Sequence, residues 1–149
     1  MIMQKPSLKS VRTLLKSKLY SKRLVFLPGY GMGIMCVICG KWIQTPEMHE
    51  AFITRGDVSG NEDLMLRIMV AENCVFVHTD KCHKEAMTED GQKKCALALL
   101  NAEGFDKIID WLNTLEPDFR SQDTINKAKK LLLEVYHERL LSELQVTPE

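Results

Sequence analysis

Two short groups of metal-binding side chains, far apart in the sequence, constrain this chain more than any other feature. The first is Cys36-x2-Cys39, followed by Gly40, and the second is His78-x3-Cys82. Zinc in structural sites takes four Cys or His ligands in a tetrahedron, commonly as two close pairs from separate parts of a chain. Gly40 favours the tight turn that such a CxxC pair needs. The pattern therefore predicts a Cys3His zinc site that joins two distant segments and stabilises the fold when zinc binds.

The cysteine count favours free thiols over disulfides. The chain has five cysteines, an odd number that does not suit a closed set of disulfides. Cys74 and Cys95 stand alone in apolar surroundings and are predicted to be small buried core residues. This usage indicates a reducing, cytoplasmic compartment. The alternative to zinc is that Cys36 and Cys39 are simply buried and that His78 is a surface residue at the end of a strand.

Charge is divided unevenly along the chain. The formal net charge is zero, but residues 1–46 hold eight of the 20 Lys and Arg and none of the 20 acids, so this segment carries +8 and residues 47–149 carry −8. An acid-free basic segment is typical of regions that bind polyanions. Its alternatives are a solvated amphipathic helix docked on the core, or a mitochondrial transit peptide. On the first interpretation, nucleic-acid phosphates would be contacted by Lys9, Arg12, Lys16, Lys18, Lys22 and Arg23.

Length and composition indicate one soluble domain without a membrane partner. The chain has 149 residues, of which 45% are hydrophobic and 27% charged. No apolar run reaches the ~18 residues of a membrane-spanning helix. The N-terminus also lacks the continuous apolar segment and small-residue cleavage site of a secretory signal.

Hydrophobic periodicity predicts an α+β fold. Strands are expected at 24–27, 48–53 and 74–77, and residues 54–64 are expected to form a polar loop. Ser7 is predicted to cap the first helix, Gly91 to break a later one, and Pro117 to end another. The expected helices cover residues 7–21, 64–71, 83–87, 92–100, 105–115 and about 121–144.

These elements suggest three parts: a basic N-terminal arm over residues 1–33, a zinc-binding core over 34–115, and a C-terminal helix over 116–149. The apolar stripe of the last helix is expected to pack on the core. The alternative is that it pairs with a second copy in a homodimer, or with a partner protein.

The order of motifs over residues 34–115 resembles the HNH endonuclease family, the ββα-metal nucleases, and in particular its phage-type members. After the CxxC pair, Met48-His49-Glu50-Ala51-Phe52 resembles the family's His-His-Ile-Phe stretch. The segment 73–78 resembles its Asn-Leu-x-x-Leu-Cys, with His78 in the first Cys position. Cys82-His83 resembles the closing Cys-His. The resemblance implies a small zinc-stapled ββα-metal core with helical extensions at both ends.

The same resemblance implies Mg2+- or Mn2+-dependent hydrolysis of phosphodiester bonds in duplex or branched DNA. His49 and His83 would bind the catalytic ion, a general base would activate water, and Asn73 would orient the base or its loop. Aligned on the family pattern, Glu50 occupies the base position. A shift of one residue instead makes His49 the base and leaves Met48, a poor ligand for a hard ion, in the ligand position. Arg55 is a further candidate for contact with the DNA backbone.

A second departure from the family lies one helical turn after His83, where many members have another metal-binding histidine and this chain has Met87. The alternative function is therefore a catalytically inactive zinc module of a phage or mobile element that binds DNA or protein. In that case His49 and His83 would serve packing or zinc binding.

Overall fold

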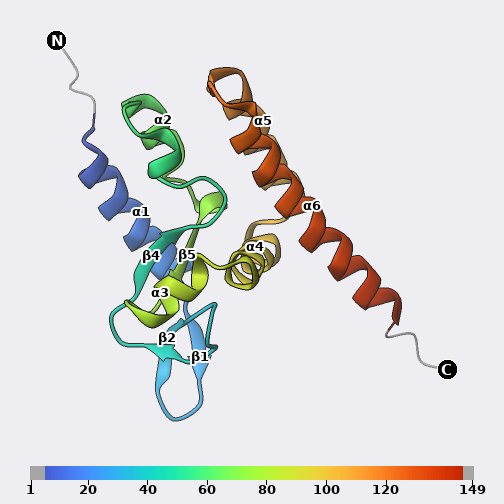
Figure 1. The fold of residues 1–149 in the computed structure, drawn as a ribbon. Coiled ribbons are helices and arrows are strands. Elements are labelled where there is room, and N and C mark those ends of the chain that lie inside the picture. The colour runs from blue at the N-terminus through green and yellow to red at the C-terminus, as the bar shows by residue number, and fades with distance from the viewer. Residues whose placement is uncertain (1–5, 146–149) are drawn as a thin grey trace.

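The computed structural model describes residues 6–145, which form an α+β fold with six α-helices and two small antiparallel sheets (Figure 1). The predicted α+β class is confirmed. The strands are β1 (Val25–Leu27), β2 (Gly31–Met35), β3 (Trp42–Ile43), β4 (Glu47–Glu50) and β5 (Cys74–Val77). The helices are α1 (Leu8–Lys22), α2 (Glu62–Arg67), α3 (Lys81–Ala86), α4 (Glu89–Glu103), α5 (Phe105–Leu115) and α6 (Gln122–Gln145).

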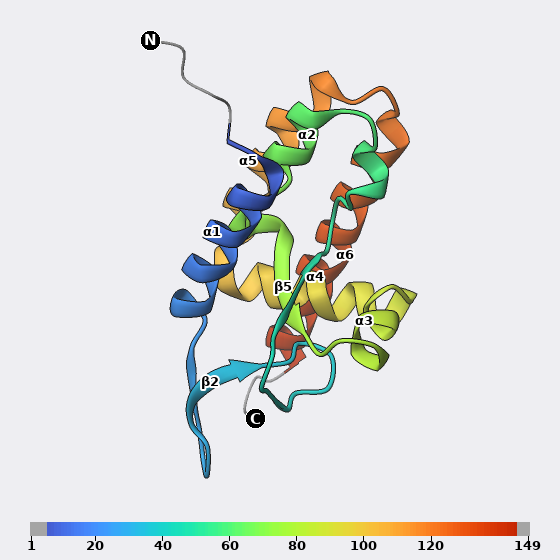
Figure 2. The same ribbon diagram turned by 90° about the vertical axis from the view of Figure 1, so that its left-hand side faces the viewer.

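The centre of the fold is an antiparallel pair of strands followed by a short helix. β4 pairs with β5, so that His49 lies opposite Val75 and Glu50 opposite Cys74. All four residues of β5 are buried, as expected for a strand with an apolar sequence that is covered on both faces. Figure 2 shows β5 near the middle of the molecule, with α1 to one side and α4 passing behind it. α3 begins shortly after β5 ends, which brings the end of the strand pair and the start of the helix together.

The other sheet is a β1–β2 hairpin with β3 added at its edge. Pro28 and Gly29 occupy the two central positions of its turn, where the Tyr30 N–H donates to the Leu27 carbonyl at 2.9 Å. Gly29 has φ +86°, which the second central residue of a type II turn requires. The hairpin projects away from the helices, and β2 leads directly into the CxxC pair (Figure 2).

The helical half packs around α4. The predicted stripe of α6 is buried against α4 and α5 through Ile125, Ala128, Leu132 and Val135, so the expectation that this helix packs on the domain is confirmed. Gly91, in contrast, does not break a helix but lies inside α4. It is buried there, and a Cβ at this position would lie 1.8 Å from the carbonyl oxygen of Glu85, so glycine allows α3 and α4 to approach closely.

The predicted boundaries differ from the observed ones near the site. The strand expected over residues 48–53 ends at Glu50, and the helix expected over 64–71 runs over Glu62–Arg67, where the Asn61 side chain accepts from the Leu64 N–H at 3.0 Å. The helix expected from residue 83 begins at Lys81.

α1 is docked on the strands. Ser7 caps it as predicted, accepting from the Ser10 N–H at 3.1 Å, and Leu19 is buried. The Arg12 guanidinium donates to the Met48 carbonyl at 3.0 Å, and that of Arg23 donates to the carbonyls of Cys74 and Ala71. No helix within residues 6–145 has the length and apolar content to cross a membrane.

Candidate metal centre and histidine pair

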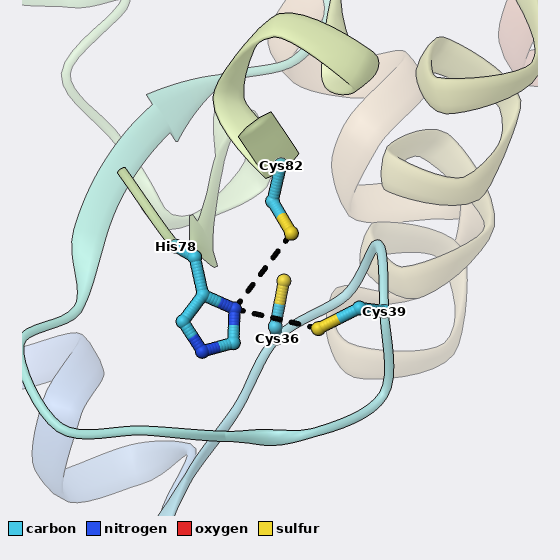
Figure 3. Close-up of side chains that lie close together, drawn as sticks. All are labelled: Cys36, Cys39, His78 and Cys82. Atoms are coloured by element: carbon cyan, nitrogen blue, oxygen red, sulfur yellow. Dashed lines mark hydrogen bonds between the residues drawn. The ribbon is translucent and has the colours of Figure 1, made fainter. Parts of the chain in front are cut away.

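The structure brings together the four side chains predicted to bind zinc. The sulfur atoms of Cys36, Cys39 and Cys82 and a ring nitrogen of His78 all lie within 4.8 Å of one another. His78 Nδ1 is 3.4 Å from Cys39 Sγ and 3.7 Å from Cys82 Sγ. Figure 3 shows the three sulfurs and this nitrogen converging on one point from three separate segments of chain.

The backbone around Cys36 and Cys39 forms the tight turn that the sequence predicts. The Gly40 N–H donates to the Cys36 carbonyl at 2.9 Å, and the Cys36 N–H donates to the Lys41 carbonyl at 2.8 Å. Gly40 has φ +72°, in the left-handed region that glycine adopts without strain. Both cysteine side chains can therefore face the same point.

His78 is oriented for metal binding by a backbone group. Its Nε2 is 3.0 Å from the Trp42 carbonyl oxygen, which can only accept a hydrogen bond. Nε2 therefore carries the proton, and Nδ1 presents its lone pair to the sulfurs. A metal-binding histidine commonly donates its second ring N–H to a carbonyl or carboxylate in this way.

The thiols of Cys36 and Cys82 differ in acidity. Burial opposes ionisation of Cys36, but hydrogen bonds from the backbone N–H groups of Cys39, His78 and Ile38 outweigh it and lower the pKa of Cys36 to about 7. Burial, together with hydrogen bonds and charge from Cys36 and Cys39, raises the pKa of Cys82 to about 12. Without a cation, one thiolate forms readily at Cys36 and suppresses ionisation of Cys82. A bound Zn2+ would favour the thiolate form of all three.

The donor set therefore fits zinc. Three thiol sulfurs and one correctly oriented imidazole form a Cys3His set, one of the usual structural zinc sites. The residues present thus support zinc as a structural cofactor that joins the CxxC turn to the start of α3. All five cysteines are free thiols, which is consistent with the predicted reducing compartment. Cys74 and Cys95 are fully buried, and burial raises the pKa of each to about 12, which confirms them as core residues.

A pair of histidines, one on β4 and one on α3, lies outside the Cys3His cluster. The rings of His49 and His83 meet edge to face with their centroids 5.1 Å apart. His49 is buried, and its burial together with His83 lowers its pKa, against the opposing effect of Glu50 and Glu47. His49 is therefore neutral at pH 7, as a metal ligand or a general base must be.

In the part of the chain that the structure describes, no third Cys, His, Asp or Glu side chain lies close enough to His49 and His83 to share an ion with them. Within residues 6–145, the Cys3His site is the one group of three or more Cys, His, Asp or Glu side chains close enough to share an ion. Met87, one turn after His83, is exposed, and its side chain offers no oxygen or nitrogen. A divalent ion held by His49 and His83 would therefore take most of its ligands from water and substrate, as Mg2+ commonly does.

Asn73 has a structural role that the sequence only partly indicated. It is fully buried, and its Oδ1 accepts from the N–H groups of Phe52 and Ile53 at 2.9 and 3.1 Å. Its Nδ2 donates to the carbonyls of Ile53 and Ile68 at 2.8 and 3.0 Å. All four hydrogen bonds of this amide are made, so Asn73 holds the segment directly after His49 and Glu50 in place. This geometry suits a residue that orients the loop and not one that contacts a substrate.

Glu50 is engaged in an ion pair. Its Oε1 lies 2.9 Å from Nε of Arg55, and its side chain is buried. Successive residues of a strand point to opposite faces, so Glu50 and His49 project from opposite sides of β4. The carboxylate predicted to act as the general base is thus ion-paired with a cation.

The basic residues predicted to bind nucleic acid fall into two groups. Arg12, Lys22 and Arg23 hold the fold together: the first binds the Met48 carbonyl, and the other two pair with buried Glu103 at 3.1 and 3.4 Å. Lys9, Lys16 and Lys18 are exposed on α1. Lys9, Arg12 and Lys16 line a cavity of about 280 Å³ together with Glu47 and Met48, directly before His49.

Two hydrogen bonds that support the site were not predicted from the sequence. One joins His78 Nε2 to the Trp42 carbonyl, and the other joins the Arg12 guanidinium to the Met48 carbonyl. Both bonds involve backbone acceptors, which have no residue-specific signal in a sequence.

Comparison with protein-family models, with curated proteins and with solved structures finds no match to this chain.

Proposed function

We propose that this protein is an HNH-type, metal-dependent DNA endonuclease in which residues 34–115 form a zinc-stapled ββα-metal core. The single observation that carries this proposal is the pairing of His49 on β4 with His83 on α3, beside the Cys3His cluster. The proposal adopts the resemblance of the sequence motifs to phage-type HNH nucleases. A strand pair followed by a helix, with zinc ligands at its base and two histidines across it, is the arrangement expected of that family.

The chain's residues would share the chemistry as follows. When bound, Mg2+ or Mn2+ would polarise the scissile phosphate and stabilise the leaving oxygen. In one division of roles, His49 and His83 hold the ion. Glu50 then activates water after it leaves Arg55 and turns from the opposite side of β4 toward the ion, with Arg55 released to a DNA phosphate. In the other, His83 holds the ion and neutral His49 accepts the proton of water. In both divisions of roles, Asn73 holds in place the segment that follows His49 and Glu50.

DNA would be gripped by the exposed lysines of α1. Lys9 and Lys16 line the cavity next to Glu47 and Met48, so phosphates bound there would lie close to the strand that carries His49. A grip of this kind is independent of base sequence and weakens with salt. These residues support a DNA-binding role for the N-terminal helix within the proposed function.

The test is cleavage of supercoiled plasmid DNA by the purified zinc-loaded protein with added Mg2+ or Mn2+. His49→Ala and His83→Ala are each expected to lower the rate at least a hundredfold, on the order of the effect of removing a general base or an ion ligand. His137→Ala is the matched control, because His137 is an exposed histidine on α6. Glu50→Gln separates the two divisions of roles: it abolishes cleavage if Glu50 is the base and spares it if His49 is. Full activity in His49→Ala would overturn the assignment.

A second candidate function is a zinc-binding module without catalysis, which binds DNA or a partner protein. The observations that favour it are the Glu50–Arg55 ion pair and the lack, within residues 6–145, of a third side chain near the histidines that could share their ion. This module would hold one zinc per chain, bind DNA or protein, and show no cleavage with Mg2+ or Mn2+. Either function would operate in a reducing compartment such as the cytoplasm.

A further inference from the structure

The β1–β2 hairpin is unusual for an exposed element. Residues 24–40 contain no charged side chain and no Ser, Thr, Asn or Gln. Phe26, Tyr30 and Met32 are nevertheless 70%, 69% and 60% exposed. Exposed strands normally carry charge that prevents unwanted association. A projecting hairpin of large apolar side chains therefore indicates a binding surface.

Both faces of the hairpin carry apolar side chains. Phe26 and Met32 are directly opposite each other in the strand register and so share one face. On the other face Trp42 lies over Gly33, where a Cβ would come within 2.4 Å of the indole nitrogen. Tyr30 stacks on Trp42 with ring centroids 5.3 Å apart and ring planes 10° apart. The hairpin is thus a thin wedge with a stacked aromatic pair on one side and Phe26 on the other.

The wedge is firmly anchored. β2 runs directly into Cys36, and the backbone carbonyl of Trp42 accepts the hydrogen bond of His78. The stacked aromatic pair is therefore attached to the metal centre through the backbone of β3.

The charge around the wedge favours a polyanion as its occupant. Residues 6–46 include no acid, and Lys22, Arg23 and exposed Lys41 lie at or near its base. Lys22 and Arg23 share the one carboxylate of buried Glu103, so these three groups together keep a net charge of +1. Nucleic-acid bases stack on aromatic side chains flanked by positive charge, and apolar wedges insert between base steps.

We infer that the β1–β2 hairpin contacts nucleic-acid bases, and that it makes the protein favour DNA with unpaired or unstacked bases over a continuous duplex. This inference rests on the proposed function and specifies its substrate class. A continuous duplex hides the faces of its bases, whereas a bulge or a single strand exposes them to Tyr30, Trp42 and Phe26. Electrostatic contacts by α1 would be common to all these substrates.

The experiment compares three fluorescein-labelled DNAs of the same sequence: a single strand, a duplex, and a duplex with a central unpaired bulge. Binding to the zinc-loaded protein is measured by fluorescence anisotropy without Mg2+ or Mn2+. The wild type is expected to bind the bulged and single-stranded DNA more tightly than the duplex. Phe26→Ala and Tyr30→Ala should each weaken binding to the DNAs with unpaired bases by roughly five- to a hundredfold, with little change for the duplex. Leu133→Ala, which removes a 52% exposed side chain on α6, is the control and should change none of the three.

A direct readout of stacking is available from tryptophan fluorescence. Trp42 is partly exposed, while Trp111 is buried, so base stacking on the hairpin should quench emission from Trp42. The quenching should disappear in Trp42→Phe. Zinc content, measured for every variant, shows that the metal centre beneath the hairpin is intact.

The outcomes separate this inference from the proposed function. If Phe26→Ala and Tyr30→Ala keep the wild-type preference while the wild type cleaves DNA with Mg2+, the inference is wrong and the function stands. If these variants instead lose self-association in sedimentation velocity without changing DNA preference, the hairpin is a protein interface and the inference is wrong. If the wild type neither binds nor cleaves any of the three DNAs, the proposed function is wrong, and the inference with it.

Discussion

His78 is the one nitrogen donor among the zinc ligands, and its Nδ1 is directed by the bond from Nε2 to the Trp42 carbonyl. Cysteine at this position would give a set of four thiolates, which zinc accepts equally well. We expect His78→Cys to keep one zinc per chain and His78→Ala to lose it on dialysis against a chelator. Because structural zinc contributes on the order of 10 kcal/mol, and 1 kcal/mol shifts Tm by about 2–4 °C in a domain of this size, Tm of His78→Ala should fall by more than about 10 °C.

Elemental analysis and thermal unfolding measure both effects, and His137→Ala is the control for loss of a histidine outside the cluster. Equal zinc content in His78→Ala and wild type would show that His78 does not bind the metal.

The sequence predicted the four residues of the Cys3His cluster because Cys and His at these spacings have few other structural reasons to occur together. It did not predict the state of Glu50. Whether that carboxylate is free depends on Arg55, which an irregular segment after β4 brings back to 2.9 Å. Asn73 was identified as a candidate, but its four hydrogen bonds depend on backbone groups at residues 52, 53 and 68.

At the level of helices and strands, the close packing of α3 against α4 depends on one glycine, Gly91. A Cβ at position 91 would clash with the Glu85 carbonyl oxygen. Because this oxygen belongs to the backbone, it cannot move aside as a flexible side chain could. Gly91→Ala should therefore destabilise the fold by about 1–3 kcal/mol, despite the higher helix propensity of alanine. Urea unfolding measures the change. Lys107→Ala, at an exposed position on α5, should stay within about 0.5 kcal/mol of wild type. A stabilised Gly91→Ala variant would show that the helices can separate at little cost.

Elements with a clear period and caps were predicted closely, and elements controlled by distant contacts were not. α5 and α6 have an apolar stripe at helical spacing, and Ser7 caps α1, so all three were expected within a residue or two of their observed bounds. The strand at residues 48–53 was predicted too long because Asn73 takes the N–H groups of Phe52 and Ile53 that a longer strand would use. Gly91 suggested a break because glycine usually weakens helices, whereas here close packing requires it.

Over the whole molecule, the basic N-terminal segment has two roles that composition alone could not separate. Leu19 packs in the core, and Arg12 and Arg23 bind carbonyls of the strand segments that flank the site. Deleting α1 would therefore damage the fold and would not isolate a DNA contact. Lys9 and Lys16 are exposed at the cavity edge and can be neutralised with the packing intact.

We expect Lys9→Gln combined with Lys16→Gln to weaken DNA binding and to reduce its salt dependence. Each phosphate contact contributes about 0.9 to the slope of log affinity against log salt concentration, so loss of two contacts should lower the slope by about 1.8. Lys127→Gln combined with Lys130→Gln removes the same charge from exposed positions on α6 and is the matched control. Titrations at several salt concentrations measure both slopes. If the two variants behave alike, the affinity depends on net charge alone. A smaller slope in the α1 variant only would place the phosphate backbone along α1, next to the strand that carries His49.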